Sequence, residues 1–475
     1  MLDKSLAFAL TSLLVVGCGD DPASTSRGML TPTGAAGVPS AAGGSAGAGG
    51  SVGGAPVGTT AGTGGSEGIG PIMNGTGAAD TGVDTSGSSP DAGDAGGGVV
   101  GALEWLPSWA TTIQSTEPNN LPPALNNNTL RQFVWPTVSG QQIRIQLSNE
   151  KGSGPVDIQK VHIARAPTAG GTSGNSNGTI DPATDVAFTF SGAPNVTIPP
   201  GQTVWSDPLD YSLQEITLNA VTMQLGANVP PEITGHPGSR ETSYIANGDA
   251  VTQQGLAGAQ TRDRWYFINA IEVMAPSDAF AIAALGDSIT DGYGVLNQFG
   301  RWPDIMTLAI QNDPRIADNR SVLNFGMGAN TLTSSSQYQD AGRLRFERDV
   351  LTRDKIKWLI VFEAINDING GTQAQPIINA YSEIIQLSHD KGILVYGVTI
   401  TPNGANAVRD AVNNWIRTSG EFDAVIDFDA LIRNPNDPNS IQPNFNNDGL
   451  HPSLAGYEAM GNSVDLSLFY EQMAN

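Results

Sequence analysis

A serine follows a short apolar run in the second half of the chain. The run spans residues 279–285 and leads into Gly286-Asp287-Ser288. Small residues before and after Ser288 allow a tight turn that presents its hydroxyl, a group that attacks carbonyl carbons in covalent catalysis. Gly-Asp-Ser is also common in ordinary loops, so the tripeptide alone favours a plain turn. A catalytic interpretation requires a base elsewhere in the chain.

An imidazole and a carboxylate near the C-terminal end could supply that base. Asp448 and His451 lie three positions apart, just before a predicted final helix. An imidazole accepts the proton of a serine hydroxyl near neutral pH, and a carboxylate on its other ring nitrogen fixes the tautomer. This spacing allows both groups to converge from one loop. A lone Asp-x-x-His pair also occurs in surface turns and at helix N-termini.

Two segments that follow predicted strands offer hydrogen-bond donors for a developing negative charge. The stretch 324–330 turns tightly, and its backbone N–H groups, including those of Gly328 and Ala329, can face an oxyanion. The side-chain amide of Asn366 is a neutral donor, as an oxyanion hole requires. An isolated asparagine at the end of a strand is more often a turn former. The serine, the Asp-His pair and these donors together suggest acyl transfer.

The four blocks, in this order, resemble the SGNH/GDSL hydrolase superfamily across residues 279–475. The resemblance implies that Ser288 is the nucleophile and donates the first oxyanion N–H, and that Asp448 and His451 are the triad acid and base. It also implies that Ala329 donates the second N–H and Asn366 the third hydrogen bond. The runs GRWPDIM, RLRFERDVL, EAINDI and DGLHPSLAGYEAMG are similar to an arylesterase/acylhydrolase branch associated with xylan-degrading systems. Members of that branch often carry a β-rich domain before the hydrolase domain, and residues 130–149 resemble its start.

The chain departs from the family pattern at two positions. Ala329 stands where the second block usually has glycine, and Ala364 stands where the Gly-x-Asn-Asp block has glycine. A methyl group at position 329 leaves the N–H available but restricts φ and narrows the pocket, so the donor role of Ala329 holds if its φ is negative. Gly328 is the alternative donor if the register differs by one residue.

A polar loop in the β-rich region offers further candidates. His236 and Arg240 lie within residues 235–243, and we consider the hypothesis that this loop reaches over the active site and shapes the substrate end. The alternative is a plain turn. Three carboxylates next to the motifs, Asp287, Asp291 and Asp367, would oppose an oxyanion, so we expect them to bind loop backbone, or in the case of Asp291 to orient the serine loop. The sequence shows no zinc-type His/Cys spacing and no phosphate loop, so we expect no metal and no cofactor.

The periodicity of the chain divides it into two folded regions. Short alternating strands separated by Gly, Pro and Asn turns predict an all-β sandwich or jelly roll over residues 102–276. Strands and helices then alternate over residues 277–475, which predicts a doubly wound parallel sheet of the flavodoxin-like type. Expected strands in the first region are 142–147, 161–164, 186–190, 221–225 and 265–273. Expected strands in the second are 279–285, 322–324, 358–362, 393–398 and 424–428, with helices at 302–311, near 344, and at 376–389, 407–418 and 453–473.

The N-terminal 101 residues indicate export. An apolar run at residues 6–16 is too short to span a bilayer and ends at Cys18, the single cysteine of the chain. This pattern resembles a bacterial lipoprotein processing site, so residues 1–18 are a predicted signal peptide and Cys18 a predicted lipidation site. An ordinary secretion signal with an incidental cysteine is the alternative. Residues 19–101 are rich in Gly, Ala, Ser and Thr and lack aromatic residues, which predicts a flexible tether.

Charge and motifs limit the classes of partner and function. The net charge is −23, which argues against nucleic acid as a partner and is typical of a soluble exported protein. We expect contact with a membrane only through the lipid anchor, and the sequence carries no signal for an oligomeric state. The predicted function is hydrolysis of short-chain carboxylic esters through an acyl-enzyme, with acetylated plant polysaccharide as one candidate substrate. Cleavage of acyl or aryl esters is a second, and an inactive glycan-binding lipoprotein is a hypothesis from a different class.

Overall fold

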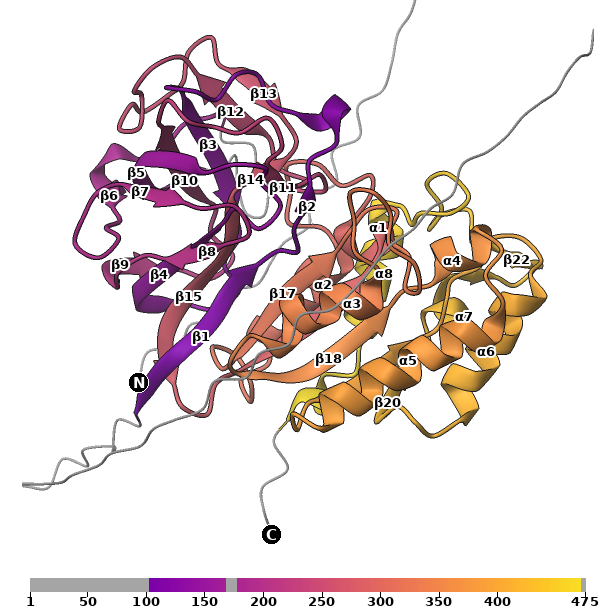
Figure 1. Ribbon diagram of the computed structural model, residues 1–475. Helices are drawn as coiled ribbons and strands as arrows, with labels where there is room; N and C mark the ends of the chain where they lie inside the picture. The colour runs from indigo at the N-terminus through magenta and orange to yellow at the C-terminus, as the bar shows by residue number, and fades with distance from the viewer. Residues whose placement is uncertain (1–101, 168–176, 471–475) are drawn as a thin grey trace, which may run out of the picture. The chain divides into compact units, whose positions relative to one another are not determined.

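The computed structural model describes residues 102–167 and 177–470 (Figure 1). These residues belong to one compact unit. The predicted signal peptide, the lipidation site Cys18 and the predicted tether lie outside them. Within the described part of the chain, no helix combines the length and apolar character that a membrane span requires.

Antiparallel sheets build the β-rich region, residues 102–276. In one sheet the order is β1 (Leu103–Ala110), β15 (Ile268–Pro276), β4 (Gly140–Ser148) and β8 (Thr203–Trp205), and β9 (Leu209–Leu213) also pairs with β4. A second runs β13 (Gln260–Arg262), β12 (Ser243–Ala246), β3 (Thr129–Val134), β10 (Asn219–Leu225), β5 (Val156–Arg165) and β6 (Val186–Ala187), with β7 (Val196–Ile198) on β5. A small third sheet joins β14 (Trp265–Tyr266), β11 (Thr234–His236) and β2 (Gln114–Ser115).

Alternating apolar residues pack the two large sheets together. On β4, Ile143, Ile145 and Leu147 are fully buried, and they share a core cluster with Val221 and Met223 of β10. Side chains point to opposite faces along a strand, so this period of two places one face of each sheet in the core. The predicted all-β fold of this region is confirmed.

Five parallel strands form the sheet of the α/β region, residues 277–470. The order is β17 (Arg320–Gly326), β16 (Phe280–Gly286), β18 (Ile356–Phe362), β19 (Leu394–Val398) and β20 (Ala424–Ile426). Counted along the chain this is the order 2-1-3-4-5 of the flavodoxin-like fold, as predicted. The strand order reverses between β16 and β18, and ligands of such sheets bind near the carboxyl ends of the strands at that point.

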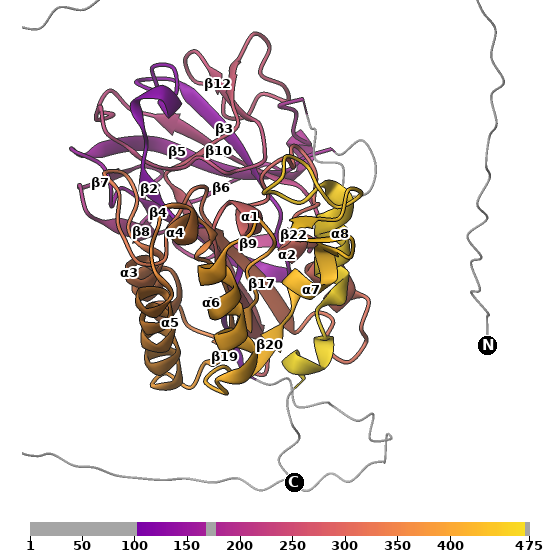
Figure 2. The same ribbon diagram turned by 90° about the vertical axis from the view of Figure 1, so that its right-hand side faces the viewer.

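Helices cover both faces of the parallel sheet (Figures 1 and 2). Ala281, Ala283 and Leu285 of β16 pack in one core cluster, and Ile282 and Ala284 pack in another on the opposite face. The first face of the sheet is covered by α3 (Gly342–Phe346), a π-helical turn (Glu347–Leu351), α5 (Ala374–His389) and α6 (Ala407–Thr418). The second face is covered by α2 (Trp302–Gln311), α7 (Phe428–Ile432), α8 (Leu454–Ser463) and a 3-10 turn (Leu466–Phe469). Two short helices, α1 (Ser288–Asp291) and α4 (Ile365–Asn369), start just after β16 and β18, and a hairpin joins β21 (Arg433–Asn434) to β22 (Asp437–Ile441).

Several predicted boundaries were wrong. The expected strand 265–273 is divided between β14 and β15, because Phe267 adopts a φ of 64° and turns the chain from one sheet to another. The expected strand 186–190 ends at Ala187, and β20 ends at Ile426 because Asp427 caps helix α7. The last helix ends at Ser463, after which Asp465 caps a separate 3-10 turn.

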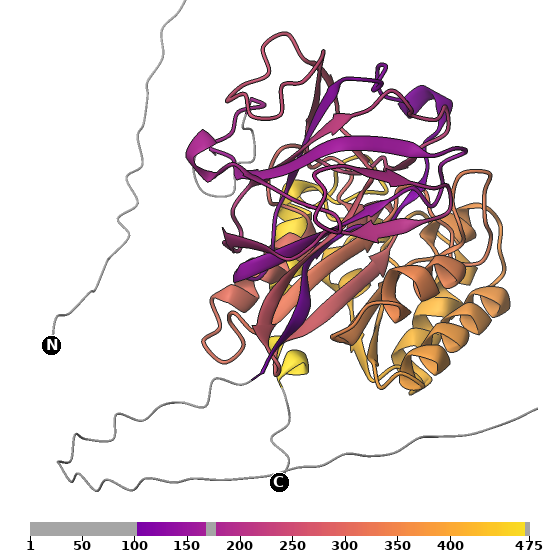
Figure 3. The ribbon, with the colours of Figure 1, turned by 60° about the vertical axis from the view of Figure 1, so that its left-hand side comes forward.

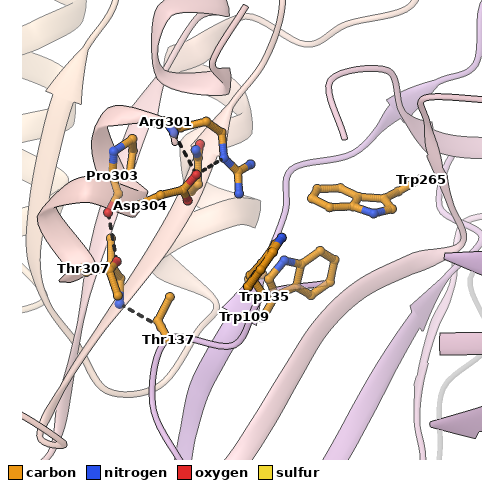
Figure 4. A pocket seen from close by; sticks show the side chains of 11 residues that line it. Trp109, Trp135, Thr137, Trp265, Arg301, Pro303, Asp304 and Thr307 are labelled. Carbon is orange, nitrogen blue, oxygen red and sulfur yellow. Dashed lines mark hydrogen bonds and ion pairs between the residues drawn. The ribbon is translucent and has the colours of Figure 1, made fainter. Parts of the chain in front are cut away.

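The β-rich region packs directly on the edge of the parallel sheet. Strand β1 lies beside β17 (Figures 1 and 3), and Ser321 of β17 donates a hydrogen bond to the Pro107 carbonyl of β1. A small cavity of about 10 Å³ at this interface, large enough for one water molecule, is lined by Trp109, Trp135, Trp265 and Arg301 (Figure 4). The two regions therefore meet through packed side chains.

Glu241 is a buried acid near this interface. Its Oε1 accepts a hydrogen bond from Trp135 Nε1 at 2.7 Å, and only 3% of the residue is exposed. Burial raises the pKa of Glu241 to about 8, although the bond from Trp135 opposes that shift. The folded protein therefore keeps a proton that the unfolded chain loses at lower pH, so this group stabilises the fold at acidic pH and loses that effect as pH rises through about 8.

We predict that Glu241→Gln makes the protein less sensitive to rising pH. The unfolding free energy of the variant relative to wild type should increase between about pH 5 and pH 8.5, by an amount on the order of a few kcal/mol. Denaturant unfolding at each pH measures this difference. The exposed Glu347→Gln serves as the control and should give a constant difference. A constant difference for Glu241→Gln as well would contradict the prediction.

Two alanines adopt the backbone conformation that glycine prefers. Ala329 has a φ of 59° and Ala364 a φ of 87°. Ala329 therefore lacks the negative φ on which its role as an oxyanion donor was made conditional, although within the described residues its N–H donates to no protein acceptor. Asn330 N–H donates to the Met327 carbonyl at 3.2 Å, and a positive φ at the third residue of such a turn is the requirement that makes glycine usual there.

We predict that Ala329→Gly stabilises the protein by about 0.5–1 kcal/mol, because the left-handed conformation costs alanine more than glycine. Ala329 is exposed, so little packing is lost with its methyl group. The exposed Ala411 in helix α6 is the matched control, and Ala411→Gly should destabilise the fold by a similar amount. Denaturant unfolding measures the change in unfolding free energy for both variants. A loss of stability in Ala329→Gly would contradict the predicted backbone strain at Ala329.

Candidate active site

Ser288 occupies the first position of helix α1, directly after strand β16. Asp287 precedes it as the N-cap, and its Oδ1 accepts the Ile289 N–H at 2.9 Å. Gly286 is required at the turn, because a Cβ there would lie 2.1 Å from Thr290 Oγ1. This arrangement presents Ser288 at the carboxyl edge of the sheet, as the sequence predicts.

A chain of two hydrogen bonds joins the serine, the histidine and the aspartate. Ser288 Oγ lies 2.8 Å from His451 Nε2, and His451 Nδ1 lies 2.8 Å from Asp448 Oδ2. Ser288 is 6% exposed. In this geometry Nε2 can accept the serine proton while the carboxylate holds the Nδ1 proton in place. The structure therefore brings together three groups that lie 163 positions apart at the widest.

The loop that carries the pair is ordered by its own carboxylate. Asp448 Oδ1 accepts the N–H groups of Leu450 at 3.1 Å and His451 at 2.8 Å. Burial would raise the pKa of Asp448, but the His451 N–H and ring together with the Leu450 N–H lower it overall. The ring of Tyr293 stacks on His451 with a centroid separation of 4.1 Å. The imidazole is thus held by hydrogen bonds at both nitrogens and by a ring on its face.

The predicted oxyanion donors lie on the segments that follow three adjacent strands, β16, β17 and β18. Within the described residues, the N–H groups of Ser288 and Ala329 donate to no protein acceptor, so both remain available to a ligand. Asn366 Nδ2 donates to the Asn330 carbonyl at 2.8 Å, which uses one of its two N–H bonds and orients the amide. Gly328 precedes Ala329 in the same turn, and its carbonyl accepts a bond from Gln339 Nε2 at 2.9 Å.

Arg345 is a structural residue of the site that the sequence analysis did not single out. It lies in α3 and is 1% exposed. Its guanidinium donates to five acceptors, at 2.8 Å to the Gly286 and Phe325 carbonyls, 2.7 Å to Asn330 Oδ1, 2.9 Å to Glu363 Oε1 and 3.1 Å to Asp349 Oδ2. The family-like run beginning at Arg343 contained this residue, but nothing in its local pattern indicated an inward-facing side chain.

Two of the three flanking carboxylates, Asp287 and Asp367, accept loop backbone N–H groups as the sequence analysis expects, whereas the Asp291 carboxylate pairs with side chains. Asp367 accepts the N–H groups of Leu332 at 2.6 Å and Thr333 at 2.9 Å. Asp287 caps α1, and burial raises its pKa to about 7. Asp291 ends α1 and pairs with two side chains of the β-rich region, His236 and Arg240.

The loop 235–243 does reach the serine helix, but through buried contacts. His236 is 3% exposed and directs Nε2 at Asp291, so it cannot present that nitrogen to a substrate. Arg240 pairs with the same carboxylate, and its guanidinium lies 5.8 Å from the ring centroid of Tyr293. Across residues 102–167 and 177–470, no three potential metal ligands cluster together.

Comparisons with known proteins match part of this chain to a protein family. Residues 284–459 match the model of the GDSL-like Lipase/Acylhydrolase family. The comparison with curated proteins gave no match. A solved member of the lipolytic protein G-D-S-L family from Veillonella parvula is 22% identical, with 39% of this chain and 96% of that chain covered and a TM-score of 0.32.

Two further solved structures cover a similar share of the chain. An acetyl xylan esterase, AlAXEase, is 21% identical over 39% of this chain and 97% of its own, with a TM-score of 0.33. A carbohydrate acetylesterase family member from Sinorhizobium meliloti is 15% identical over 40% of this chain and 96% of its own, with a TM-score of 0.31. The family match begins four residues before Ser288 and includes His451, and it shows that the α/β region of this chain is a GDSL-like lipase/acylhydrolase domain.

Proposed function

We propose that this chain is an exported serine ester hydrolase that forms an acyl-enzyme on Ser288. The observation that carries the proposal is the hydrogen-bonded chain from Ser288 Oγ through His451 to Asp448, with both distances at 2.8 Å. The GDSL-like family match supports carboxylic ester hydrolysis in general. Export and lipid anchoring at Cys18 rest on the N-terminal sequence alone.

The proposed reaction has two halves. Ser288 Oγ attacks the ester carbonyl carbon while His451 Nε2 takes the hydroxyl proton, and the negative oxygen of the tetrahedral intermediate accepts bonds from Ser288 N–H, Ala329 N–H and Asn366. The intermediate collapses, and His451 returns the proton to the leaving alcohol. Water, deprotonated by His451, then releases the acid from the acyl-enzyme. Asp448 stays ionised throughout and stabilises the imidazolium.

The alcohol portion of the substrate should lie beside His451, because that residue protonates the leaving oxygen. Tyr293 and Leu296 follow the serine helix, and they are 44% and 49% exposed. An open rim with an aromatic side chain can accommodate a bulky ring such as a sugar. These residues support a large alcohol, and we propose short acyl groups on it, with acetylated polysaccharide as the substrate class.

We predict that Ser288→Ala lowers kcat/KM for p-nitrophenyl acetate by at least about 10³-fold, because the nucleophile is removed. Ser463→Ala, a change at an exposed serine in α8, is the control and should retain full activity. A fluorophosphonate probe should label wild type and not Ser288→Ala. Equal, measurable rates in the two variants would exclude Ser288 as the nucleophile, and absence of both hydrolysis and labelling in wild type would favour the inactive glycan-binding hypothesis.

The substrate class has its own test. Rates should fall steadily from p-nitrophenyl acetate to longer acyl esters, and acetylated xylan should release acetate. Faster cleavage of octanoate than of acetate would reject the short-chain proposal and favour a lipase.

Asp287 predicts an alkaline limit to activity. Its pKa is raised to about 7 by burial, so the folded protein loses this proton as pH rises through about 7. The carboxylate then lies one residue from Ser288 and opposes the negative charge of the intermediate. We predict that kcat/KM of wild type declines above about pH 7 and that Asp287→Asn, which keeps an oxygen acceptor for the Ile289 N–H, retains activity to higher pH. Superimposable pH profiles would contradict this role.

A further inference from the structure

A buried carboxylate at the end of the serine helix is bound by two side chains from the β-rich region. Asp291 Oδ1 lies 3.0 Å from His236 Nε2, and Asp291 Oδ2 accepts a bond from Arg240 Nη2 at 2.7 Å. Arg240 Nε also donates to the Asp291 main-chain carbonyl at 3.2 Å. Arg240 therefore binds both the side chain and the backbone of the last residue in α1.

The protein leaves no space for Asp291 to occupy another position. A Cβ on Gly238, in the loop that carries His236 and Arg240, would lie 1.8 Å from Asp291 Oδ2. On the other side, a Cβ on Gly326 of β17 would lie 2.2 Å from the Asp291 nitrogen. The residue is 1% exposed and fits between these two glycines.

The same arginine also reaches the histidine through an aromatic ring. Its guanidinium lies 5.8 Å from the centroid of Tyr293, and Tyr293 stacks on His451 at 4.1 Å. The Tyr293 N–H donates to the Ser288 carbonyl at 2.9 Å, so this ring is attached to the serine helix as well. Arg240 thus contacts both the segment that carries the nucleophile and the ring that supports the base.

We infer that Arg240, with Asp291 and His236, is a positioning residue for the hydrolysis proposed above, and that the β-rich region acts in catalysis by fixing Ser288 against His451. This inference rests on the proposed function. Helix α1 has four residues, too few to hold its own orientation through internal hydrogen bonds. Its orientation therefore depends on contacts with neighbouring segments, which include the bond from Asn324 to the Thr290 carbonyl and the contacts of Asp291.

The role predicts an effect on turnover more than on substrate binding. A displacement of about 1 Å between reacting groups can cost roughly 10²-fold in rate. None of the three residues contacts the proposed position of the ester, so binding of a small ester should change little. A residue needed only for folding would instead lower the amount of active protein and leave kcat per active site unchanged.

The experiment uses the full chain and counts active sites by fluorophosphonate titration. Arg240→Met should lower kcat per labelled site for p-nitrophenyl acetate by about 10- to 100-fold, with KM within about twofold. Arg240→Lys keeps the charge but lacks the planar fork that binds carboxylate and carbonyl together, so it should recover part of the loss. Asp291→Asn should lower kcat similarly, and combining it with Arg240→Met should add little further loss.

Arg144→Met is the matched control, because Arg144 forms a comparable ion pair with Glu272 inside the β-rich region. The side chain of Arg144 is 26% exposed and that of Arg240 is 19% exposed. Arg144→Met should lose stability without losing kcat. If wild type is active and Arg240→Met keeps its kcat, or loses no more than Arg144→Met, the positioning role is refuted and the proposed function stands. If wild type is neither active nor labelled, the proposed function is refuted and the positioning role with it.

Discussion

The guanidinium of Arg345 holds the ends of three parallel strands in one place. It donates to the carbonyls of Gly286 and Phe325 and to the carboxylate of Glu363, which lie at or just beyond the ends of β16, β17 and β18. The next few residues of those segments carry Ser288, Ala329 and Asn366. Loss of this fully buried cation would leave several buried acceptors unpaired, a change that costs roughly 3–5 kcal/mol for a buried ion pair alone. Arg345, which lies outside the blocks that carry the proposed reacting groups, thus helps to set the relative position of the proposed nucleophile and oxyanion donors.

The β-rich region contacts the same network from two directions. Thr112, after β1, donates to Asp349 Oδ2 at 2.5 Å, and that carboxylate also binds Arg345. Gln339 Nε2 bridges Gln114 Oε1 at 2.9 Å and the Gly328 carbonyl at 2.9 Å, which connects β2 to the turn of Ala329. With the loop 235–243 on α1, these contacts enclose the strand ends that carry the site. A chain of hydrogen bonds therefore leads from the β-rich region to the groups proposed to react.

The sequence predicts those features that local pattern determines. Helices α2 and α6 have the predicted bounds, and the motifs locate Ser288, Asp448 and His451 because each stands beside a recognisable strand or helix end. Arg345 was missed because its importance comes from contacts with residues up to 59 positions away. For the loop 235–243 the sequence left a position over the site and a plain turn as alternatives, and it did not indicate that His236 binds Asp291 and is hidden from substrate. Such contacts depend on how the two regions pack, and no local periodicity encodes that.

Contacts around Ala329 and Ala364 hold both alanines in the positive-φ conformation that glycine prefers. A non-glycine residue with positive φ costs about 1–3 kcal/mol and persists only where neighbouring groups over-determine the backbone. Beside Ala329, the Asn330 side chain is bound by Arg345 and its carbonyl by Asn366. Asn366 lies two residues beyond Ala364, and its side chain is oriented by the hydrogen bond that it donates to the Asn330 carbonyl. The two strained turns are therefore bonded to each other, and the hydrogen bonds that offset their strain also hold the proposed oxyanion donors rigid before substrate binds.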